Sequence, residues 1–187
     1  MNRLLSGVAS AVGLAVALLA SPAVLAADPQ QVKQGEYLAR AADCMACHTA
    51  PGGAPYAGGL PIVSPFGTIY GTNITPDKEH GIGLYSDDEF FAALTEGKRR
   101  DGANLYPAMP YTSYHLIPRA DSDAIHAYLK TIAPINRAAP VTSLSFPFNV
   151  RLGLMGWNML YGKDVKLAPA EGKGKEWQRG QYMVDVL

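Results

Sequence analysis

The two cysteines of this 187-residue chain stand close together, in the run Cys44-Met45-Ala46-Cys47-His48. Two thiols at this spacing, followed at once by an imidazole, form the C-x-x-C-H pattern that attaches haem through two thioether bonds. In that pattern the adjacent imidazole reaches the iron from one face. The sequence therefore predicts one covalently attached haem c, held by Cys44, Cys47 and His48.

Three other uses of a cysteine pair compete with haem attachment. In an exported chain two cysteines can form a disulfide, and a two-residue gap also fits a thioredoxin-like redox pair. Zinc is disfavoured because no second pair of Cys or His residues at ligand spacing follows in the sequence. The thioredoxin interpretation needs a βαβ unit, which the sequence does not indicate. His48 directly after the second cysteine favours haem.

Met109 is predicted to bind the opposite face of the iron. It lies in Tyr106-Pro107-Ala108-Met109-Pro110-Tyr111, where two prolines stiffen a loop that could hold a thioether against iron. Met45 lies inside the attachment motif and cannot reach the far face. Met155 and Met159 are four residues apart on an apolar helix face, which is typical of core or contact surface.

Among the histidines, only His115 rivals Met109, because it follows six residues later and would give bis-histidine ligation. His126 is expected on the surface of a helix that runs from about Ser122 to Ile132. His80 is expected in a polar loop.

Ligation by His48 and Met109 would fill both axial positions of the iron and favour Fe(II) through the soft thioether. Such a site exchanges single electrons and does not bind substrate. No nucleophile motif, phosphate loop or dinucleotide fingerprint is present in the sequence. We therefore expect an electron carrier without a substrate-oxidising site; a haem enzyme or ligand sensor would require Met109 to be absent from the iron.

Helices joined by long loops must position these residues, since Gly (19) and Pro (14) are abundant. Asp28-Pro29 is typical of a helix start, and Gly35 would either let a second helix cross closely or be a tolerated glycine within the helix. Ser86 and Glu89 form a capping-box pattern for a short helix that Gly97 ends.

The helix after Asp121 is expected to end before Pro134 and to pack its apolar stripe on the helix around Gly35. The long loop 56–80 is expected to be ordered by the haem. Lys98-Arg99-Arg100 is interpreted as a solvated cationic cluster, with haem propionates or an acidic partner as alternatives.

Residues 1–26 are predicted to be a cleaved signal peptide. Arg3 supplies positive charge, Leu4–Ala20 carries none, Pro22 breaks the apolar run, and Val24-Leu25-Ala26 offers small residues for cleavage. An uncleaved membrane anchor is the alternative, because the run approaches the ~18 residues that span a bilayer. Acidic and basic residues balance at 16 each, so no nucleic-acid surface is indicated.

Three stretches of the chain, residues 72–77, 81–90 and 105–111, together resemble the cytochrome c subunits of bacterial membrane-bound dehydrogenases for alcohol, gluconate, sorbitol or fructose. The resemblance covers roughly residues 30–187. It implies an all-α, class I cytochrome c fold with long loops wrapped around the covalent haem. It also places haem attachment on Cys44 and Cys47 and the axial ligands on His48 and Met109.

The resemblance further implies a role in periplasmic electron transfer on the outer face of the inner membrane. Subunits of this family accept electrons from a flavin- or quinone-containing catalytic subunit and pass them to ubiquinone. An independent monohaem carrier with a soluble partner is the alternative. The sequence does not name the substrate, because the cytochrome does not touch it.

The chain departs from this family in having one C-x-x-C-H run where three haem domains are normal. Residues 179–184 echo residues 34–39, so a second attachment motif would fall just beyond Leu187. The expected division is a cytochrome domain at 27–135, an apolar connecting segment at 136–175, and the start of a truncated second cytochrome repeat at 176–187. Within the connecting segment, residues 146–161 are expected to pack between domains, with a membrane surface or the catalytic subunit as alternatives.

Overall fold

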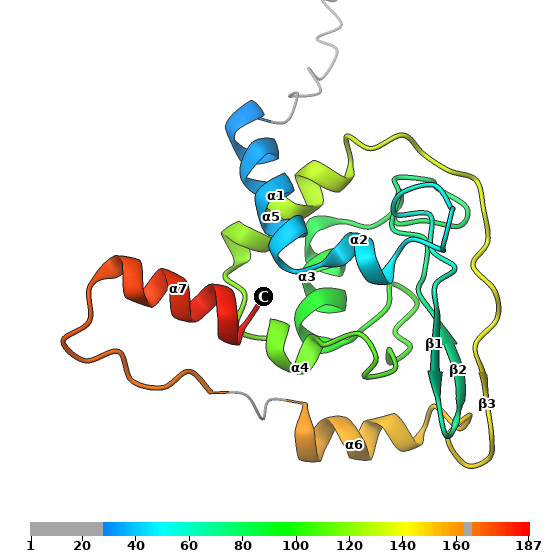
Figure 1. Cartoon of the computed structure of the whole chain (residues 1–187). Coiled ribbons are helices and arrows are strands. Elements are labelled where there is room, and N and C mark those ends of the chain that lie inside the picture. Colours follow the sequence, from blue (N-terminus) through cyan, green and yellow to red (C-terminus); the bar gives the residue numbers. More distant parts are fainter. Residues whose placement is uncertain (1–27, 163–165) are drawn as a thin grey trace, which may run out of the picture.

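The structure is a computed structural model that describes residues 28–162 and 166–187. The predicted signal peptide lies outside the described residues. Figure 1 shows the arrangement of the elements, which in chain order are α1 (Pro29–Ala41), α2 (Cys44–Cys47), β1 (Pro61–Ser64), β2 (Gly67–Tyr70), α3 (Asp87–Glu96), α4 (Tyr111–Tyr114), α5 (Arg119–Leu129), β3 (Ser143–Leu144), α6 (Gly153–Tyr161) and α7 (Lys175–Asp185).

Helices α1 and α5 cross and pack closely on one another, and α1 leads directly into the cysteine-bearing turn α2 (Figure 1). The Asp28 side chain caps α1 by accepting a hydrogen bond from the Gln30 N–H at 2.9 Å. A Cβ added to Gly35 would lie 1.8 Å from the Ala124 carbonyl oxygen, so only glycine allows this crossing. Leu38 and Ile125 are buried in the core that results. The predicted helix start and the predicted close crossing are both confirmed.

The capping box predicted for α3 is confirmed, with Ser86 and Glu89 satisfying each other's backbone N–H groups. Gly97 ends the helix at φ +62°, as predicted. On the neighbouring helix α5, His126 is fully buried and stacks on Phe90, which corrects the expectation of a surface position. Helix α5 also begins at Arg119, earlier than expected, directly after the extended Pro118.

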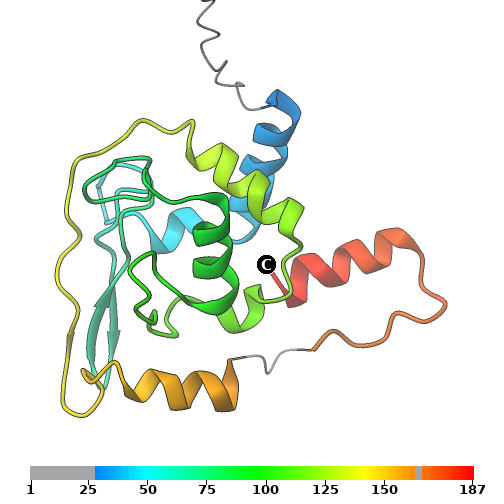
Figure 2. The same cartoon turned by 180° about the vertical axis from the view of Figure 1, so that it is seen from behind.

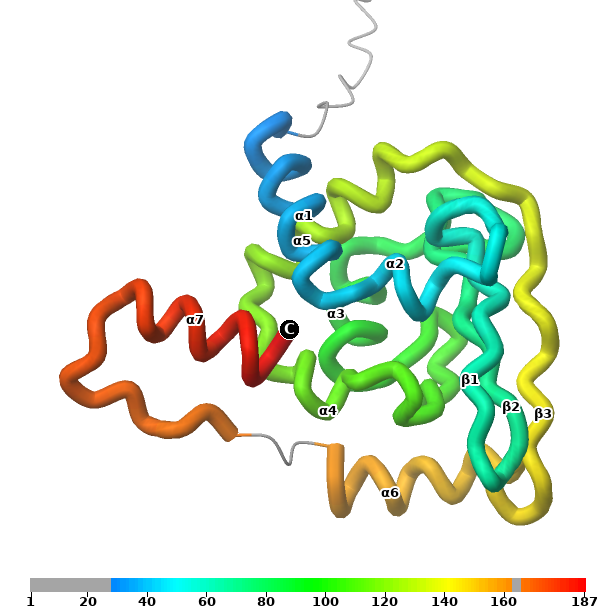
Figure 3. Tube along the Cα trace, in the orientation of Figure 1, coloured from blue at the N-terminus to red at the C-terminus, as the bar shows by residue number. Residues whose placement is uncertain are grey.

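The expectation of an all-α fold is incomplete, because the mostly helical chain also holds a three-stranded antiparallel sheet in the order β1-β2-β3. Strands β1 and β2 form a hairpin in which Ser64 pairs with Gly67. The segments 61–64 and 67–70 are rich in β-branched residues, which favour strands. Gly67 is required where β3 arrives, since an added Cβ would lie 2.2 Å from the Ser143 carbonyl oxygen. Figure 3 shows the extended chain that leads from α5 along the outside to β3.

The segments after β3 pack on the body of the molecule (Figures 1 and 2). Helix α6 contacts Tyr111 through Trp157 and leaves Met159 83% exposed. Tyr182 of α7 and Val186, which follows the helix, are buried in the same core as α1 and α5. None of the described helices is both long and apolar enough to cross a bilayer. The division into domains stays a prediction.

Candidate haem-binding site

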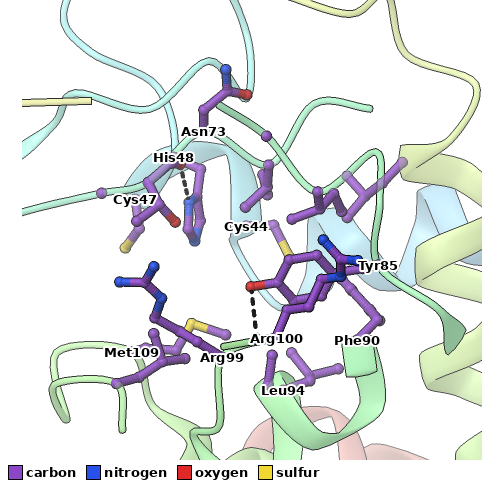
Figure 4. Close-up of a pocket in the computed structure, with 18 of the residues that line it drawn as sticks. Cys44, Cys47, His48, Asn73, Tyr85, Phe90, Leu94, Arg99, Arg100 and Met109 are labelled. Atoms are coloured by element: carbon purple, nitrogen blue, oxygen red, sulfur yellow. Dashed lines mark hydrogen bonds between the residues drawn. The ribbon is translucent and has the colours of Figure 1, made fainter. Parts of the chain in front are cut away.

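A cavity of about 830 Å³ lies between α2, α3 and the loops that precede α3 and α4. Its size falls within the range of cofactor sites. Cys44, Cys47, His48 and Met109 all line it, although Met109 is far from the others in the sequence. Figure 4 shows His48 and Met109 on opposite sides of the hollow. The fold therefore brings all four predicted site residues together.

The two cysteines are presented by the single helical turn α2. Asp43 precedes this turn with a left-handed backbone, at φ 51°, which redirects the chain as it leaves α1. The two thiols are not joined in a disulfide. Burial raises the pKa of Cys44 to about 12, so this sulfur is held as the neutral thiol. Both sulfurs are thus available for thioether bonds to a cofactor in the cavity.

The backbone fixes the orientation of the His48 ring. Its Nδ1–H donates to the Thr72 carbonyl oxygen at 2.7 Å, which makes Nε2 the ring nitrogen that could bind a metal. Gly71 makes this approach possible, because an added Cβ would lie 1.9 Å from the Cys47 carbonyl oxygen. Burial lowers the pKa of His48 and thereby favours the neutral imidazole that can bind a metal.

Asn73 orders the loop that carries Thr72. Its side-chain amide donates to the Ile135 and Arg137 carbonyl oxygens at 2.7 and 3.1 Å. Its Oδ1 accepts from the backbone N–H and the hydroxyl of Thr75, at 2.9 and 2.7 Å. Both side chains are buried. The segment 56–80 was expected to be a long loop ordered by the haem. These hydrogen bonds also hold its residues 73–75, and its residues 61–64 and 67–70 form strands β1 and β2.

Tight backbone turns hold Met109. Its N–H donates to the Tyr106 carbonyl oxygen at 3.1 Å, and its own carbonyl oxygen accepts from the Tyr111 N–H at 2.8 Å. The Tyr114 hydroxyl then donates to the Ala42 carbonyl oxygen at 2.7 Å and ties α4 to the end of α1. The two halves of the site are thereby fixed to one another.

The remaining histidines take three different positions. His115, the rival ligand, is not among the residues that line the cavity, and its Nδ1 bonds to the Thr112 carbonyl oxygen at 2.7 Å. His80 does line the cavity, which its polar surroundings in the sequence did not indicate. His126 lies behind Phe90, which itself lines the cavity.

Three arginines also line the cavity. Arg99 pairs with Asp101 at 2.8 Å and Arg100 with Glu89 at 3.4 Å, while both side chains stay about half exposed. Guanidinium groups here complement the carboxylates that a haem carries. Sequence reasoning had favoured a solvated cluster for the first two and had missed Arg151, which no local motif marks.

The walls of the cavity between these polar groups are apolar and suit the faces of a porphyrin ring. The apolar residues that line it include Ile62, Ile69, Ile74, Ile82, Leu84, Phe90, Leu94 and Leu105. Two free thiols, an oriented imidazole, a thioether on the opposite side and cations at the edge complete the donor set. The residues present therefore fit a covalently attached haem.

No family model matches the chain, but curated relatives do. It is 47% identical over 158 residues to the gluconate 2-dehydrogenase cytochrome c subunit of Pantoea cypripedii, covering 83% of this chain and 36% of that one. It is 45% identical over 160 residues to the cytochrome c subunit of a quinone alcohol dehydrogenase from Gluconacetobacter polyoxogenes, covering 84% and 34%. It is 43% identical over 176 residues to the fructose dehydrogenase cytochrome subunit of Gluconobacter japonicus, covering 89% and 35%. The chain thus spans about a third of these relatives' lengths.

Proposed function

Because this chain is homologous over most of its length to the cytochrome c subunits of bacterial dehydrogenases, we propose that it transfers electrons through one haem c. Cys44 and Cys47 would attach the haem, and His48 and Met109 would ligate its iron. The observation that carries this proposal is the convergence of these four residues on one cavity, with the two axial candidates on opposite sides.

A bound haem c would supply one-electron exchange at its iron, with a reduction potential raised by the thioether ligand. The protein's own contribution is to hold the ligands and exclude competitors. The Thr72 carbonyl oxygen keeps His48 in the tautomer that presents Nε2. Apolar lining residues such as Phe90 and Leu94 would shield a bound haem from water. With His48 and Met109 both holding the haem, its iron would have no position open to a substrate.

We further propose that the chain serves a catalytic dehydrogenase subunit that contains a flavin or a quinone and passes electrons towards ubiquinone. The supporting fact is that its relatives are named as subunits of dehydrogenases. This role would place it on the periplasmic side of the inner membrane, after export by the predicted signal peptide.

The haem and its ligands are tested on the chain produced in a periplasm that attaches haem c. We expect a c-type haemochrome spectrum and, in the oxidised protein, the sulfur-to-iron charge-transfer band. Met109→Ala should abolish that band, lower the reduction potential and let the reduced protein bind CO, because the sixth position is opened.

His115→Ala is the matched control and should leave the band, the potential and CO binding unchanged. If His115→Ala instead abolishes six-coordination while Met109→Ala does not, the assignment of Met109 is wrong.

Reduction of the purified cytochrome by a purified dehydrogenase and its substrate tests the partner. A cytochrome that stays oxidised with the gluconate, alcohol and fructose enzymes would contradict the role as their electron acceptor.

A further inference from the structure

We propose that residues 151–158, here called the strap, hold the Met109 loop (residues 104–110) against the cavity, with Arg151 and Asn158 as positioning residues. The inference rests on the proposed function, because it takes Met109 as an iron ligand. The strap lies in the segment that sequence reasoning treated as a connection between domains. It contacts the loop on both sides of Met109, with Arg151 at the cavity lining and Asn158 outside the lining.

Arg151 holds the side of the loop that precedes Met109. Its guanidinium lies over the Tyr106 ring, 4.4 Å from the centroid, and donates to the Asn104 carbonyl oxygen at 2.6 Å. The carbonyl oxygen of Tyr106 is the acceptor for the Met109 N–H. A shift of Tyr106 would therefore shift the backbone of Met109.

Asn158 holds the side that follows Met109. Its Oδ1 accepts from the Tyr111 hydroxyl at 2.7 Å. The Trp157 ring meets the Tyr111 ring edge-on, with centroids 6.2 Å apart. Tyr111 is buried, and its N–H donates to the Met109 carbonyl oxygen. Strap residues thus contact Tyr106 and Tyr111, one on each side of Met109, and each of these forms a hydrogen bond with the Met109 backbone.

The Met109 loop gains from such support because the two backbone hydrogen bonds of Met109 only close turns within residues 106–111. Pro107 and Pro110 have no N–H to donate, and residues 104–110 lie in no helix or strand. A ligand on a loop that detaches part of the time admits competing ligands in proportion to the detached fraction. The strap would keep this fraction low.

Asn158→Ala is the sharpest test, because Asn158 is neutral and does not line the cavity. The probe is imidazole, titrated into the oxidised holoprotein. We expect its apparent affinity to rise about fivefold, which corresponds to about 1 kcal/mol, the typical contribution of one hydrogen bond. The charge-transfer band should also be lost at a lower temperature than in the wild type.

Tyr111→Phe removes the same hydrogen bond from the other side and should raise the imidazole affinity as well, with less than additive effects in the double variant. Met159→Ala, at an exposed position on the same helix, is the control and should match the wild type. A wild type without the charge-transfer band would overturn the proposed ligation. A wild type with the band, and with unchanged imidazole affinity in both Asn158→Ala and Tyr111→Phe, would overturn the strap alone.

Discussion

His126 on α5 stacks on Phe90 with ring centroids 4.4 Å apart and an interplanar angle of 2°. Its Nδ1–H donates to Asp87 Oδ1 at 2.7 Å, and Lys130 donates to the same oxygen at 2.7 Å. The Nε2 of His126 is buried without a hydrogen-bond partner among the described residues. A proton on Nε2 would therefore place an unpaired N–H in the core, behind the wall of the haem cavity.

The stability of the protein is predicted to depend on pH through His126. Burial and the nearby Lys130 charge lower the pKa of His126 below its usual 6.5, against the opposing effect of Asp87. Below about pH 6.5 the unfolded chain therefore takes up a proton at His126 that the folded chain does not. The free energy of unfolding is highest above that pH and falls as the pH drops below it. Denaturant unfolding of the holoprotein from pH 8 to pH 5 measures the loss.

His126→Gln should be less stable than the wild type at pH 8, by about 1 kcal/mol, because it loses the bond to Asp87. Its unfolding free energy should fall less steeply between pH 6.5 and pH 5, since the glutamine does not titrate. The two curves should therefore approach one another towards acid pH. Parallel curves would show that another group carries the pH dependence.

At the scale of elements, the close contact between α1 and α5 depends on Gly35 having no side chain. Gly35→Ala would place Cβ 1.8 Å from the Ala124 carbonyl oxygen. We expect overpacking to cost about 1–3 kcal/mol of unfolding free energy, although alanine is the better helix former by about 1 kcal/mol. Denaturant unfolding of the holoprotein measures the change.

Gly180→Ala is the matched control, because Gly180 lies inside α7 with no heavy atom within 4 Å of an added Cβ. There the helix preference of alanine acts alone, and stability should rise by up to about 1 kcal/mol. A gain of stability at Gly35 would contradict the packing of α1 on α5, whereas a loss at Gly180 would contradict the open surroundings of that residue in α7.

Elements with local signals could be predicted from the sequence. Asp28, Ser86 and Gly97 mark helix ends through contacts within a few residues, and these signals stand in the sequence itself. All three strands were missed, and the third has no local signal, since Gly67 pairs with Leu144 across most of the domain. The burial of His126 was also missed, because the residues that cover it come from another helix.

The candidate site likewise combines residues that local motifs predict with residues that only tertiary contacts bring into place. The attachment motif lies in adjacent residues, and the two prolines marked Met109 directly. Arg151 escaped prediction because its position at the cavity depends on how the chain after α5 returns to it. That path is determined by tertiary contacts such as the bonds from Asn73 to Ile135 and Arg137.

At the scale of the whole molecule, Asn73 is predicted to be the residue that joins the His48 side of the site to the returning chain. Asn73→Ala would leave the Ile135 carbonyl oxygen and the Thr75 N–H without this partner. Buried groups left unpaired cost about 1–3 kcal/mol each, so we expect a loss of at least about 2 kcal/mol. Thermal or denaturant unfolding of the holoprotein measures it.

Asn136→Ala is the control for this change. Asn136 is exposed, and its side-chain amide donates to Glu79 at 2.9 Å. We expect its removal to change stability by no more than about 0.5 kcal/mol. Equal effects at Asn73 and Asn136 would show that the buried network does not hold the loop.

The path of the chain after α5 has a consequence for how such proteins can be recombined. Residues 135–137 accept the bonds from Asn73 behind His48, and residues 151–158 contact both sides of the Met109 loop. A gene fusion that joined another domain after residue 134 would keep Cys44, Cys47, His48 and Met109 but lose the outer support of both sides of the site. A transplantable cytochrome module of this kind therefore extends at least to Asn158, well past Met109, and α7 adds Tyr182 to the same core.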